Sequence, residues 1–360
     1  MRLGFIAVIL AFLGLVIWTA WHFWLILPFS KCGKWAFTAL YLLSFLVLIP
    51  HYAWGDRMPF WLAVCTYELG NSWIIFFLYA VLIFIVLGLG RLLHLLPASF
   101  LKDSAGGSAT VLGILALLLV YGGLHYKHKY RESFEIQTGK PLEKPLTLVL
   151  ASDLHAGYHN RKSELSRWAD MINAEHPDLV LFAGDIIDGS LRPVREGRYE
   201  EVFRRIQAPV YACLGNHEYF SGETDAEAFL AAAGIHLLRD SSAVAQGVRI
   251  IGRDDRSNPD RAPLSVLAPR DTLFTILLDH QPYHLEEAQE AGIDFQFSGH
   301  THHGQVWPLS WLTDIMYEKA FGHHRRGDTQ YYISSGLGIW GGKFRIGTRS
   351  EYVVLKIIPR

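Results

Sequence analysis

The sequence predicts two parts of different kinds: an all-α transmembrane bundle of about four helices, followed by a domain of the α/β class. Residues 1–126 are strongly apolar and nearly free of acidic residues, whereas residues 127–360 have the composition of an ordinary soluble domain. In the second part, short apolar runs alternate with segments of helical periodicity, which is the pattern of an α/β fold. We therefore place the main boundary after residue 126, with a linker over 127–144 and the α/β domain over 145–360.

The overall composition excludes some classes of protein. The net charge is −1, so no general basic field favours nucleic acid, and we expect no nucleic-acid partner. The three cysteines, Cys32, Cys65 and Cys213, are far apart and show no CxxC spacing. A disulfide framework or a zinc finger is therefore not expected.

The first part contains four apolar runs long enough to cross a bilayer, which takes about 20 residues. They cover residues 3–27, 36–54, 73–93 and 109–126. The stretch 60–70 is too short to cross alone, and it either extends the third span or lies at the membrane interface. The first run is too long, and has too few basic residues before it, for a cleavable signal, so we expect it to remain as an anchor.

The basic residues of the loops predict the orientation. The first and third loops carry Lys31, Lys34, Arg91 and Lys102. The positive-inside rule places these loops in the cytoplasm, and four spans then return the second part to the outer face. The basic segment 126–131 favours the opposite orientation or contact with anionic headgroups.

The second part contains five apolar runs with the length of buried strands, over 146–153, 178–185, 208–216, 272–280 and 293–300. Helical spacing predicts helices within 161–177 and 225–235, the latter closed by Gly234. Each strand-like run ends in a side chain that can bind a metal: Asp153, Asp185, Asn216, His280 and His300. Because sites in α/β sheets gather at the carboxyl ends of strands, these five side chains should converge.

Further candidate ligands accompany the strand ends. His155 lies two residues after Asp153, His217 directly follows Asn216, and His302 lies two residues after His300. Oxygen and imidazole ligands without thiolate suit Mn, Fe, Zn or Ni. The set is too large for one ion but suits two divalent ions that share Asp185. Such pairs hydrolyse phosphate esters, because they activate water and stabilise the charge of an in-line displacement.

The series DLH, GDIID, GNHE, H and GHTH resembles the calcineurin-like metallophosphoesterase superfamily, over roughly residues 146–356. The C-terminal stretches YYISSGLGIW and FRIGTRSEYVVLKI resemble its membrane-associated bacterial branch. The resemblance implies a four-layer α/β sandwich with a dimetal site at its sheet edges. It assigns Asp153, His155 and His302 to one metal and Asn216, His280 and His300 to the other, with Asp185 as the bridge. His217 would be catalytic and not a ligand: it would contact the phosphate and protonate the leaving oxygen.

Two positions depart from the family pattern. Glu218 stands where aspartate is commoner, and we expect it to orient His217. His303 replaces a usual glycine, and it either binds substrate at the rim or fills space. Other roles also stay open. Arg192, Arg195 and Arg198 either grip an anion or lie on a solvated surface, and so do the side chains of GHHRRGD (322–328). Asp188 should fix either its turn or a ligand histidine.

The resulting functional prediction is a membrane-anchored dimetal phosphohydrolase of a bacterial inner membrane. It would cleave a phosphodiester or pyrophosphate bond by attack of metal-activated hydroxide, on a substrate that we expect to be lipid-linked. Manganese is the favoured metal. The alternatives are a phosphodiesterase or phosphatase for soluble substrates, an inactive sensor or scaffold, and a transporter. No ligand is missing from the motifs, which disfavours the scaffold, and the spans contain few ionisable residues, which disfavours the transporter.

Overall fold

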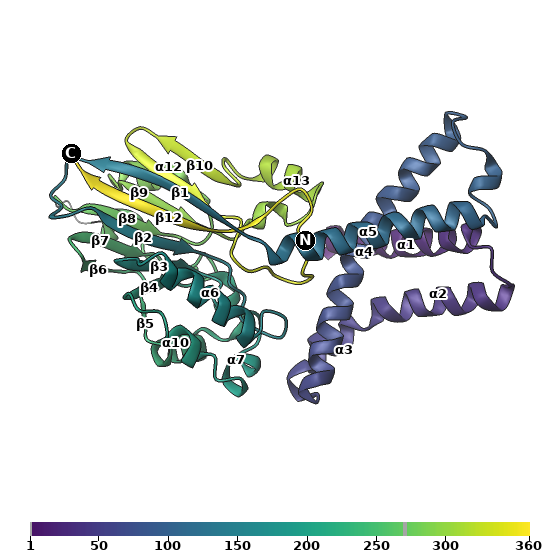
Figure 1. The fold of residues 1–360 in the computed structure, drawn as a ribbon, viewed down its shortest axis with the longest axis horizontal. Helices are drawn as coiled ribbons and strands as arrows, with labels where there is room; N and C mark the ends of the chain where they lie inside the picture. Colours follow the sequence, from purple (N-terminus) through teal and green to yellow (C-terminus); the bar gives the residue numbers. More distant parts are fainter. Residues whose placement is uncertain (1, 269–271) are drawn as a thin grey trace. The chain divides into compact units, whose positions relative to one another are not determined.

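The computed structural model describes residues 2–268 and 272–360, which form two compact units (Figure 1). The first unit runs to Leu124 and also includes Gly341–Phe344. The second comprises His125–Trp340 and Arg345–Arg360. The predicted boundary at residue 126 thus lies within two residues of the observed one.

The first unit is all-helical. Its elements are α1 (Arg2–Ile26), α2 (Lys31–Leu46), α3 (Leu48–Trp54), η1 (Gly55–Arg57), α4 (Phe60–Leu92), η2 (Ala98–Phe100) and α5 (Ala105–Lys127). Four of its segments are long and apolar enough to cross a membrane: Ile6–Ile26, Lys31–Arg57, Phe60–Leu92 and Ala105–Lys127. The stretch 60–70 forms the start of α4, so it extends the third span.

The first and third loops lie at the same end of this helical unit. Lys34 forms an ion pair with Asp103. The backbone N–H groups of Asp103 and Ser104 donate to the carbonyl oxygens of Leu25 and Ile26, at 2.8 and 2.9 Å. This arrangement agrees with four consecutive crossings. The side of the membrane on which each end lies stays a prediction.

The second unit contains two six-stranded sheets. The first has the order β1-β12-β2-β3-β4-β5, and the second has the order β10-β11-β9-β8-β7-β6. The strands of the first sheet are β1 (Lys129–Thr138), β2 (Leu146–Ala151), β3 (Leu179–Ala183), β4 (Val210–Cys213), β5 (Ile235–Leu237) and β12 (Ser350–Pro359). Those of the second are β6 (Ser241–Ala245), β7 (Val248–Gly252), β8 (Phe274–Leu278), β9 (Phe295–Ser298), β10 (Gly322–Arg326) and β11 (Thr329–Ile333).

The two sheets pack face to face and helices cover their outer faces (Figure 1). The inner core joins residues of both sheets, such as Leu148 and Leu181 of the first and Ile276 and Phe297 of the second. A second core lies between the first sheet and its helices, and a third between the second sheet and α11 and α12. The result is the expected four-layer α/β sandwich, because each sheet buries one face against the other sheet and one against helices.

The helices of this unit are short. They are α6 (Lys162–Ala174), α7 (Arg192–Glu196), α8 (Glu200–Phe203), α9 (Asn216–Ser221), α10 (Glu223–Ala232), α11 (Leu264–Leu267), α12 (Leu285–Glu290), η3 (His302–Gly304) and α13 (Leu309–Met316). The predicted helices correspond to α6 and α10. Gly234 follows α10 with a φ of +76°, a left-handed conformation that glycine adopts without steric cost.

The linker prediction for 127–144 is wrong over most of its length. Lys129–Thr138 forms β1, which pairs in parallel with β12 at the edge of the first sheet. Ile136 and Thr138 are buried while Glu135 and Gln137 are exposed. Burial alternates along the strand with a period of two, but charged residues on both of its faces, such as Arg131 and Glu132, hide the apolar run that identifies the central strands.

Strands β2, β3 and β4 are parallel neighbours in one sheet, and β8 and β9 are parallel neighbours in the other. Their carboxyl ends therefore lie at common sheet edges. The loops after these five strands carry all the predicted metal ligands.

Candidate metal centre

The predicted ligand loops hold one another in place through their backbones. The N–H of Asp153 donates to the carbonyl oxygen of Gly184 at 3.1 Å, and the N–H of His155 donates to that of Asp185 at 2.9 Å. The N–H of His300 donates to the Asp153 carboxylate at 3.0 Å. Loops after β2, β3 and β9 are thus joined directly, although they are far apart in sequence.

Five of the predicted ligands have left-handed backbone conformations. The φ angles of Asp153, His155, Asp185, His300 and His302 are +54°, +46°, +51°, +69° and +47°. Such angles are uncommon for residues with a Cβ and cost on the order of 1 kcal/mol each. Strain of this kind gathers where side-chain positions matter for function, which supports a functional role for these loops.

Two glycines of the motifs lie where any larger residue would clash with a predicted ligand. A Cβ atom on Gly215 would lie 2.2 Å from Asp185 Oδ1, and one on Gly299 would lie 2.3 Å from Asp153 Oδ2. Both distances are far inside van der Waals contact. The glycines in GNHE and GHTH therefore let the neighbouring loops approach the two carboxylates.

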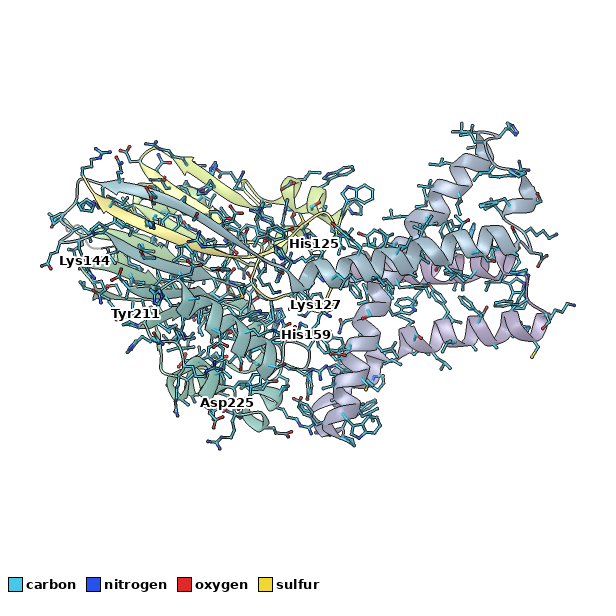
Figure 2. The ribbon with its side chains drawn as sticks, in the orientation of Figure 1. His125, Lys127, Lys144, His159, Tyr211 and Asp225 are labelled. Carbon is cyan, nitrogen blue, oxygen red and sulfur yellow. The ribbon has the colours of Figure 1, made fainter. Side chains whose placement is uncertain are left out.

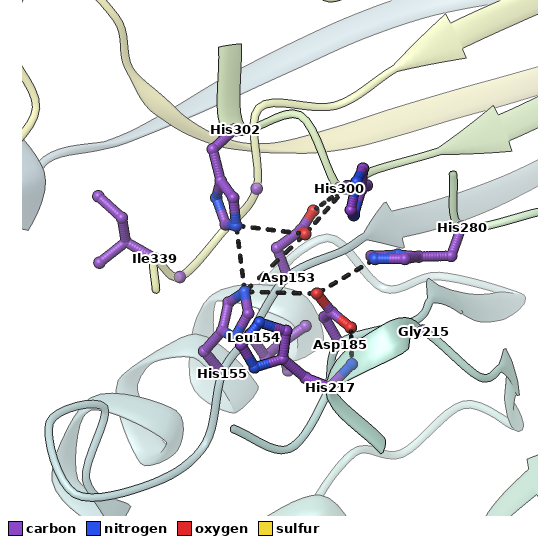
Figure 3. Close-up of polar contacts among 12 residues, drawn as sticks. Asp153, Leu154, His155, Asp185, Gly215, His217, His280, His300, His302 and Ile339 are labelled. Atoms are coloured by element: carbon purple, nitrogen blue, oxygen red, sulfur yellow. Dashed lines mark hydrogen bonds and ion pairs between the residues drawn. The ribbon is translucent and has the colours of Figure 1, made fainter. Parts of the chain in front are cut away.

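The first predicted ligand group comes together in the structure (Figure 3). Nε2 of His155 lies 3.1 Å from Nε2 of His302, and the latter atom lies 3.5 Å from Asp153 Oδ1. The three residues offer ligand atoms that all lie within 4.8 Å of one another, close enough to hold one ion.

The second predicted group also comes together. Asp185, His280 and His300 offer another set of ligand atoms within 4.8 Å of one another. Nε2 of His280 lies 3.1 Å from Asp185 Oδ2, and Asn216 Oδ1 lies 2.8 Å from Nδ1 of His300. Asp185 Oδ2 is also 3.7 Å from Nε2 of His155, so this carboxylate lies between the two groups (Figure 3).

The charges of the centre fit bound cations. Asp153 and Asp185 are 0% and 2% exposed. Within 2–268 and 272–360, their ion-pair partners are histidines, and no lysine or arginine pairs with either carboxylate. Two buried carboxylates without a permanent counter-charge are costly. Divalent cations held by these side chains would neutralise them.

The imidazoles differ in charge for clear physical reasons. Burial lowers the pKa of His300 to about 4, and burial with the neighbouring His155 holds the pKa of His302 well below its usual value. Both rings are therefore neutral, as metal ligation requires. Burial alone would lower the pKa of His280, but the Asp185 carboxylate raises it well above the usual value. That carboxylate thus attracts positive charge to the position between the two side chains.

His217 lies beside the ligand groups. With His155 and Asp185 it forms a third set of potential ligand atoms within 4.8 Å of one another. Its Nδ1, however, lies 3.0 Å from Asp188 Oδ1. Burial disfavours the charged ring, yet Asp185 and Asp188 raise the pKa of His217 to about 9. A protonated ring held by a carboxylate is suited to donate a proton.

Glu218 has a different role from the expected one. Its carboxylate accepts hydrogen bonds from the backbone N–H groups of Asp185, Ile187 and Gly215, at 3.0, 2.9 and 2.7 Å. The expectation that it orients His217 is wrong, because its longer side chain reaches back to the loop after β3. It joins the loops after β3 and β4, which carry Asp185 and Asn216.

Asp188 contacts His217 and also a predicted ligand. Its Oδ1 lies 3.5 Å from Nδ1 of His155, which leaves Nε2 of that ring to face the other ligands. Of the two roles left open, the structure shows contact with a ligand histidine. His159 (Figure 2) is a further buried neighbour of Asp188. Its Nδ1 lies 3.7 Å from Asp188 Oδ2, and its Nε2 lies 2.5 Å from the Ile339 carbonyl oxygen.

Arg345 is a positioning residue that the motifs did not indicate. It is fully buried, and its guanidinium donates to the carbonyl oxygens of His302, Ser335 and Gly338 and to Ser350 Oγ. It therefore anchors the backbone of the GHTH loop. Because its partners are mostly backbone carbonyls, no residue type elsewhere in the sequence reveals this role.

The substitution Arg345→Met should destabilise the second unit. It leaves several buried carbonyl groups without a donor, which costs about 1–3 kcal/mol each, and we expect a net loss of about 3 kcal/mol. Such a loss lowers the melting temperature by roughly 6–12 °C in a domain of this size. Thermal unfolding in detergent measures the shift. Arg205→Met, at an exposed ion pair with Asp170, is the control and should change it little. Equal melting temperatures for both variants would contradict the anchoring role.

The basic clusters form ion pairs with acidic side chains that are not part of the ligand groups. Arg192, Arg195 and Arg198 pair with Glu196, Asp225 and Glu201, at 2.7, 2.6 and 2.7 Å. The side chains of GHHRRGD belong largely to the edge strand β10, where His324 and Arg326 both pair with Glu318. These pairs favour the surface interpretation over an anion grip.

His303 also packs within the domain. Its ring stacks on Phe321 with centroids 4.7 Å apart, and its Nε2 lies 3.5 Å from Asp314 Oδ1. Of the two roles proposed for His303, these contacts favour space filling.

Comparison with known proteins agrees with this geometry. Residues 146–304 match the family model of the calcineurin-like phosphoesterases, a span that includes all seven predicted ligands and His217. Residues 146–304 are therefore a calcineurin-like phosphoesterase domain, and the described part of the chain also contains four apolar helices of membrane-spanning length.

Several relatives share both features or one of them. A metallophosphoesterase of Helicobacter pylori strain J99 is 31% identical over 227 residues, which cover 61% of this chain and 61% of that protein, so the match spans less than two thirds of either. A transmembrane protein with metallophosphoesterase domain from Danio rerio is 29% identical over 334 residues, covering 84% of this chain and 75% of the other. The second alignment is longer than the phosphoesterase domain, so it also includes part of the apolar helical region. Among solved structures, a 5′-nucleotidase precursor from Thermus thermophilus aligns with 59% of this chain and 54% of its own, at 18% identity and a TM-score of 0.35.

Proposed function

We propose that this protein is a membrane-anchored dimetal phosphohydrolase that cleaves a phosphodiester or pyrophosphate bond of a lipid-linked substrate. One observation supports the proposal: six of the seven predicted ligands offer atoms within two clusters, one of which contains the buried carboxylate of Asp185, and Asn216 Oδ1 lies 2.8 Å from the His300 ring (Figure 3). No residue of the motif series is replaced by one that cannot ligate. An inactive scaffold would not need to keep this buried and strained arrangement.

Each side chain has a proposed role. Asp153, His155 and His302 would hold one divalent cation, and Asn216, His280 and His300 the other, with Asp185 shared. Oxygen and imidazole ligands suit Mn, Fe, Zn or Ni, of which we favour Mn. When bound, such a pair of cations would activate water and stabilise negative charge on the phosphoryl oxygens.

His217 would act on the leaving group. Its ring is held by Asp188 at 3.0 Å, and at neutral pH a group with a pKa of about 9 carries a proton. From this position it would donate that proton to the oxygen that leaves the phosphorus. Its positive charge would also favour the binding of a phosphate anion.

Two exposed aromatic side chains favour a substrate with an apolar part. Phe220 is 66% exposed and its ring centroid lies 5.1 Å from that of His217. Trp340 is 43% exposed and its ring lies 6.3 Å from that of His217. Apolar rings beside the proposed proton donor would contact the leaving group. This favours a lipid-linked phosphate over a fully polar one, although a soluble phosphodiester is the second candidate.

A substrate panel tests the proposal on the full-length protein in detergent with Mn²⁺. We expect hydrolysis of bis-p-nitrophenyl phosphate and at least about tenfold higher kcat/KM for nucleotide-linked or pyrophosphate-linked lipids in mixed micelles, because one tenfold step needs only about 1.4 kcal/mol of apolar contact. The headgroups without acyl chains serve as controls. Equal turnover with and without acyl chains would contradict the lipid-linked substrate. No hydrolysis of any ester with Mn²⁺, Fe²⁺, Zn²⁺ or Ni²⁺ would contradict the phosphohydrolase itself.

A further inference from the structure

Helix α13 turns its apolar residues outward. Trp311, Leu312, Ile315 and Met316 are 62%, 53%, 82% and 57% exposed. Their spacing of three and four residues places them on one face of the helix. A helix on the surface of a soluble domain normally buries such a face.

Two polar side chains of α13 contact the domain, although that of Asp314 is also 53% exposed. Ser310 is buried, and Thr313 Oγ1 donates to the Ser310 carbonyl oxygen at 2.8 Å. Asp314 Oδ1 lies 3.5 Å from Nε2 of His303. Helix α13 is therefore amphipathic, but its apolar face points outward, whereas the apolar face of a surface helix usually points into the domain.

Neighbouring residues extend the exposed face. Trp307 and Leu309 are 41% and 39% exposed, and the rings of Trp307 and Trp311 meet edge to face with centroids 5.4 Å apart. We call the set of exposed apolar side chains the apolar ridge; it consists of Trp307, Leu309, Trp311, Leu312, Ile315 and Met316. Asp314 is the one charged residue within 307–316. Contiguous apolar surface of this kind usually marks an interaction site.

A lipid bilayer could cover this apolar surface, and the chain carries segments that would place it in one. The chain contains four helices long and apolar enough to cross a bilayer. The last of them, α5, ends at Lys127, and β1 starts at Lys129. The connection between the last span and the first strand of the domain is thus one residue long, so we expect lipid headgroups to be within reach of the domain. Tryptophan also prefers the membrane interface, where its ring meets apolar chains and its N–H meets polar groups.

We propose that the apolar ridge inserts into the interfacial layer of the bilayer that holds the four spans. The ridge would act as an interfacial helix, with its apolar side chains among the upper acyl chains and its polar side against the domain. This contact goes beyond anchoring, because the spans alone fix the protein to the membrane but do not orient the catalytic domain.

The ridge is also joined to the candidate metal centre. Trp307 follows the GHTH loop closely in the chain, and His303 of that loop contacts both Asp314 of α13 and Phe321. Insertion of the ridge would therefore hold the ligand loop of His300 and His302 next to the lipid surface. This consequence rests on the proposed function: a lipid-linked phosphate could reach the centre without leaving the bilayer.

A depth measurement on the full-length protein tests the contact. In a background with Cys32→Ser and Cys65→Ser, Ile315→Cys is labelled with an environment-sensitive fluorophore and the protein is reconstituted into phosphatidylcholine vesicles. We expect nitroxides on the lipid acyl chains to quench this probe at least about twofold. Val266→Cys is the matched control, because Val266 is an aliphatic residue with 75% exposure on α11. The control probe should stay unquenched.

The outcomes separate this proposal from the proposed function, because quenching does not require hydrolysis. Equal and weak quenching at both positions would overturn the proposed membrane contact. Shielding of position 315 that depends on protein concentration would also overturn it, because it indicates contact with a second copy.

The double variant Trp311→Ser with Ile315→Ser gives a second readout. It should turn over bis-p-nitrophenyl phosphate like the parent protein but lose about tenfold in turnover of a lipid-linked substrate in vesicles. Unchanged turnover in vesicles would contradict the link to the substrate.

Discussion

The variant Asp185→Asn should lower hydrolysis by at least about 10³-fold and reduce the bound metal from two ions per chain to one or none. Asp185 is the carboxylate that lies between both ligand groups, with its Oδ2 at 3.1 Å from His280 and 3.7 Å from His155. An amide has one neutral oxygen ligand and no charge, so it cannot serve two cations equally. Elemental analysis and the assay with bis-p-nitrophenyl phosphate measure the two effects.

A stability measurement distinguishes this loss from misfolding. Asparagine has the same shape as aspartate, so the close approach of Gly215 to this side chain is preserved. Burial alone would raise the pKa of Asp185, but His280 and His217 hold it well below its usual value, so its charge stabilises the metal-free folded protein. In the presence of a chelator, Asp185→Asn should therefore still unfold cooperatively, but at a lower temperature than the parent protein. Asp170→Asn, at an exposed ion pair of α6, is the matched control and should retain both metals. Full metal content and activity in Asp185→Asn would show that the bridge is assigned incorrectly.

The variant His217→Gln should keep both metals and lose about 10²- to 10⁴-fold in kcat, which is the usual contribution of a general acid. The loss should be larger for esters with poor leaving groups, such as phenyl esters, than for p-nitrophenyl esters. A good leaving group needs little protonation, because its anion is already stable. Measuring kcat over a series of substituted phenyl esters gives this dependence.

A histidine elsewhere on the domain provides the control for this variant. His236 is an exposed residue of β5 whose ring stacks on Tyr211 at 5.0 Å, and His236→Gln should behave like the parent protein. Loss of one metal in His217→Gln would identify this residue as a ligand, in agreement with its proximity to His155 and Asp185. An equal loss for all leaving groups would indicate that it binds the phosphate but donates no proton.

The sequence was sufficient to predict the elements that have strong local signals. The five apolar runs correspond to the central strands β2, β3, β4, β8 and β9, and the residues that follow them converge as expected. Central parallel strands are apolar on both faces, so they are evident in a linear sequence. The spacing of the motifs was equally informative, because each ligand lies a fixed, short distance beyond its strand.

Other parts of the fold depend on partners that a linear pattern does not reveal. The edge strand β1 exists because β12, from the other end of the chain, pairs with it. Arg345 anchors the loop of His302 through carbonyl groups that any residue could supply. The outward apolar face of α13 has the same helical periodicity as a buried one. Only the structure shows which side of the helix faces the domain.

Anomalous diffraction from crystals of the manganese-loaded protein tests the dimetal centre most directly. We predict two manganese peaks for each chain, one among Asp153, His155 and His302 and the other among Asn216, His280 and His300, with Asp185 contacting both. A single peak, or two peaks of which neither lies beside Asp185, would contradict the account.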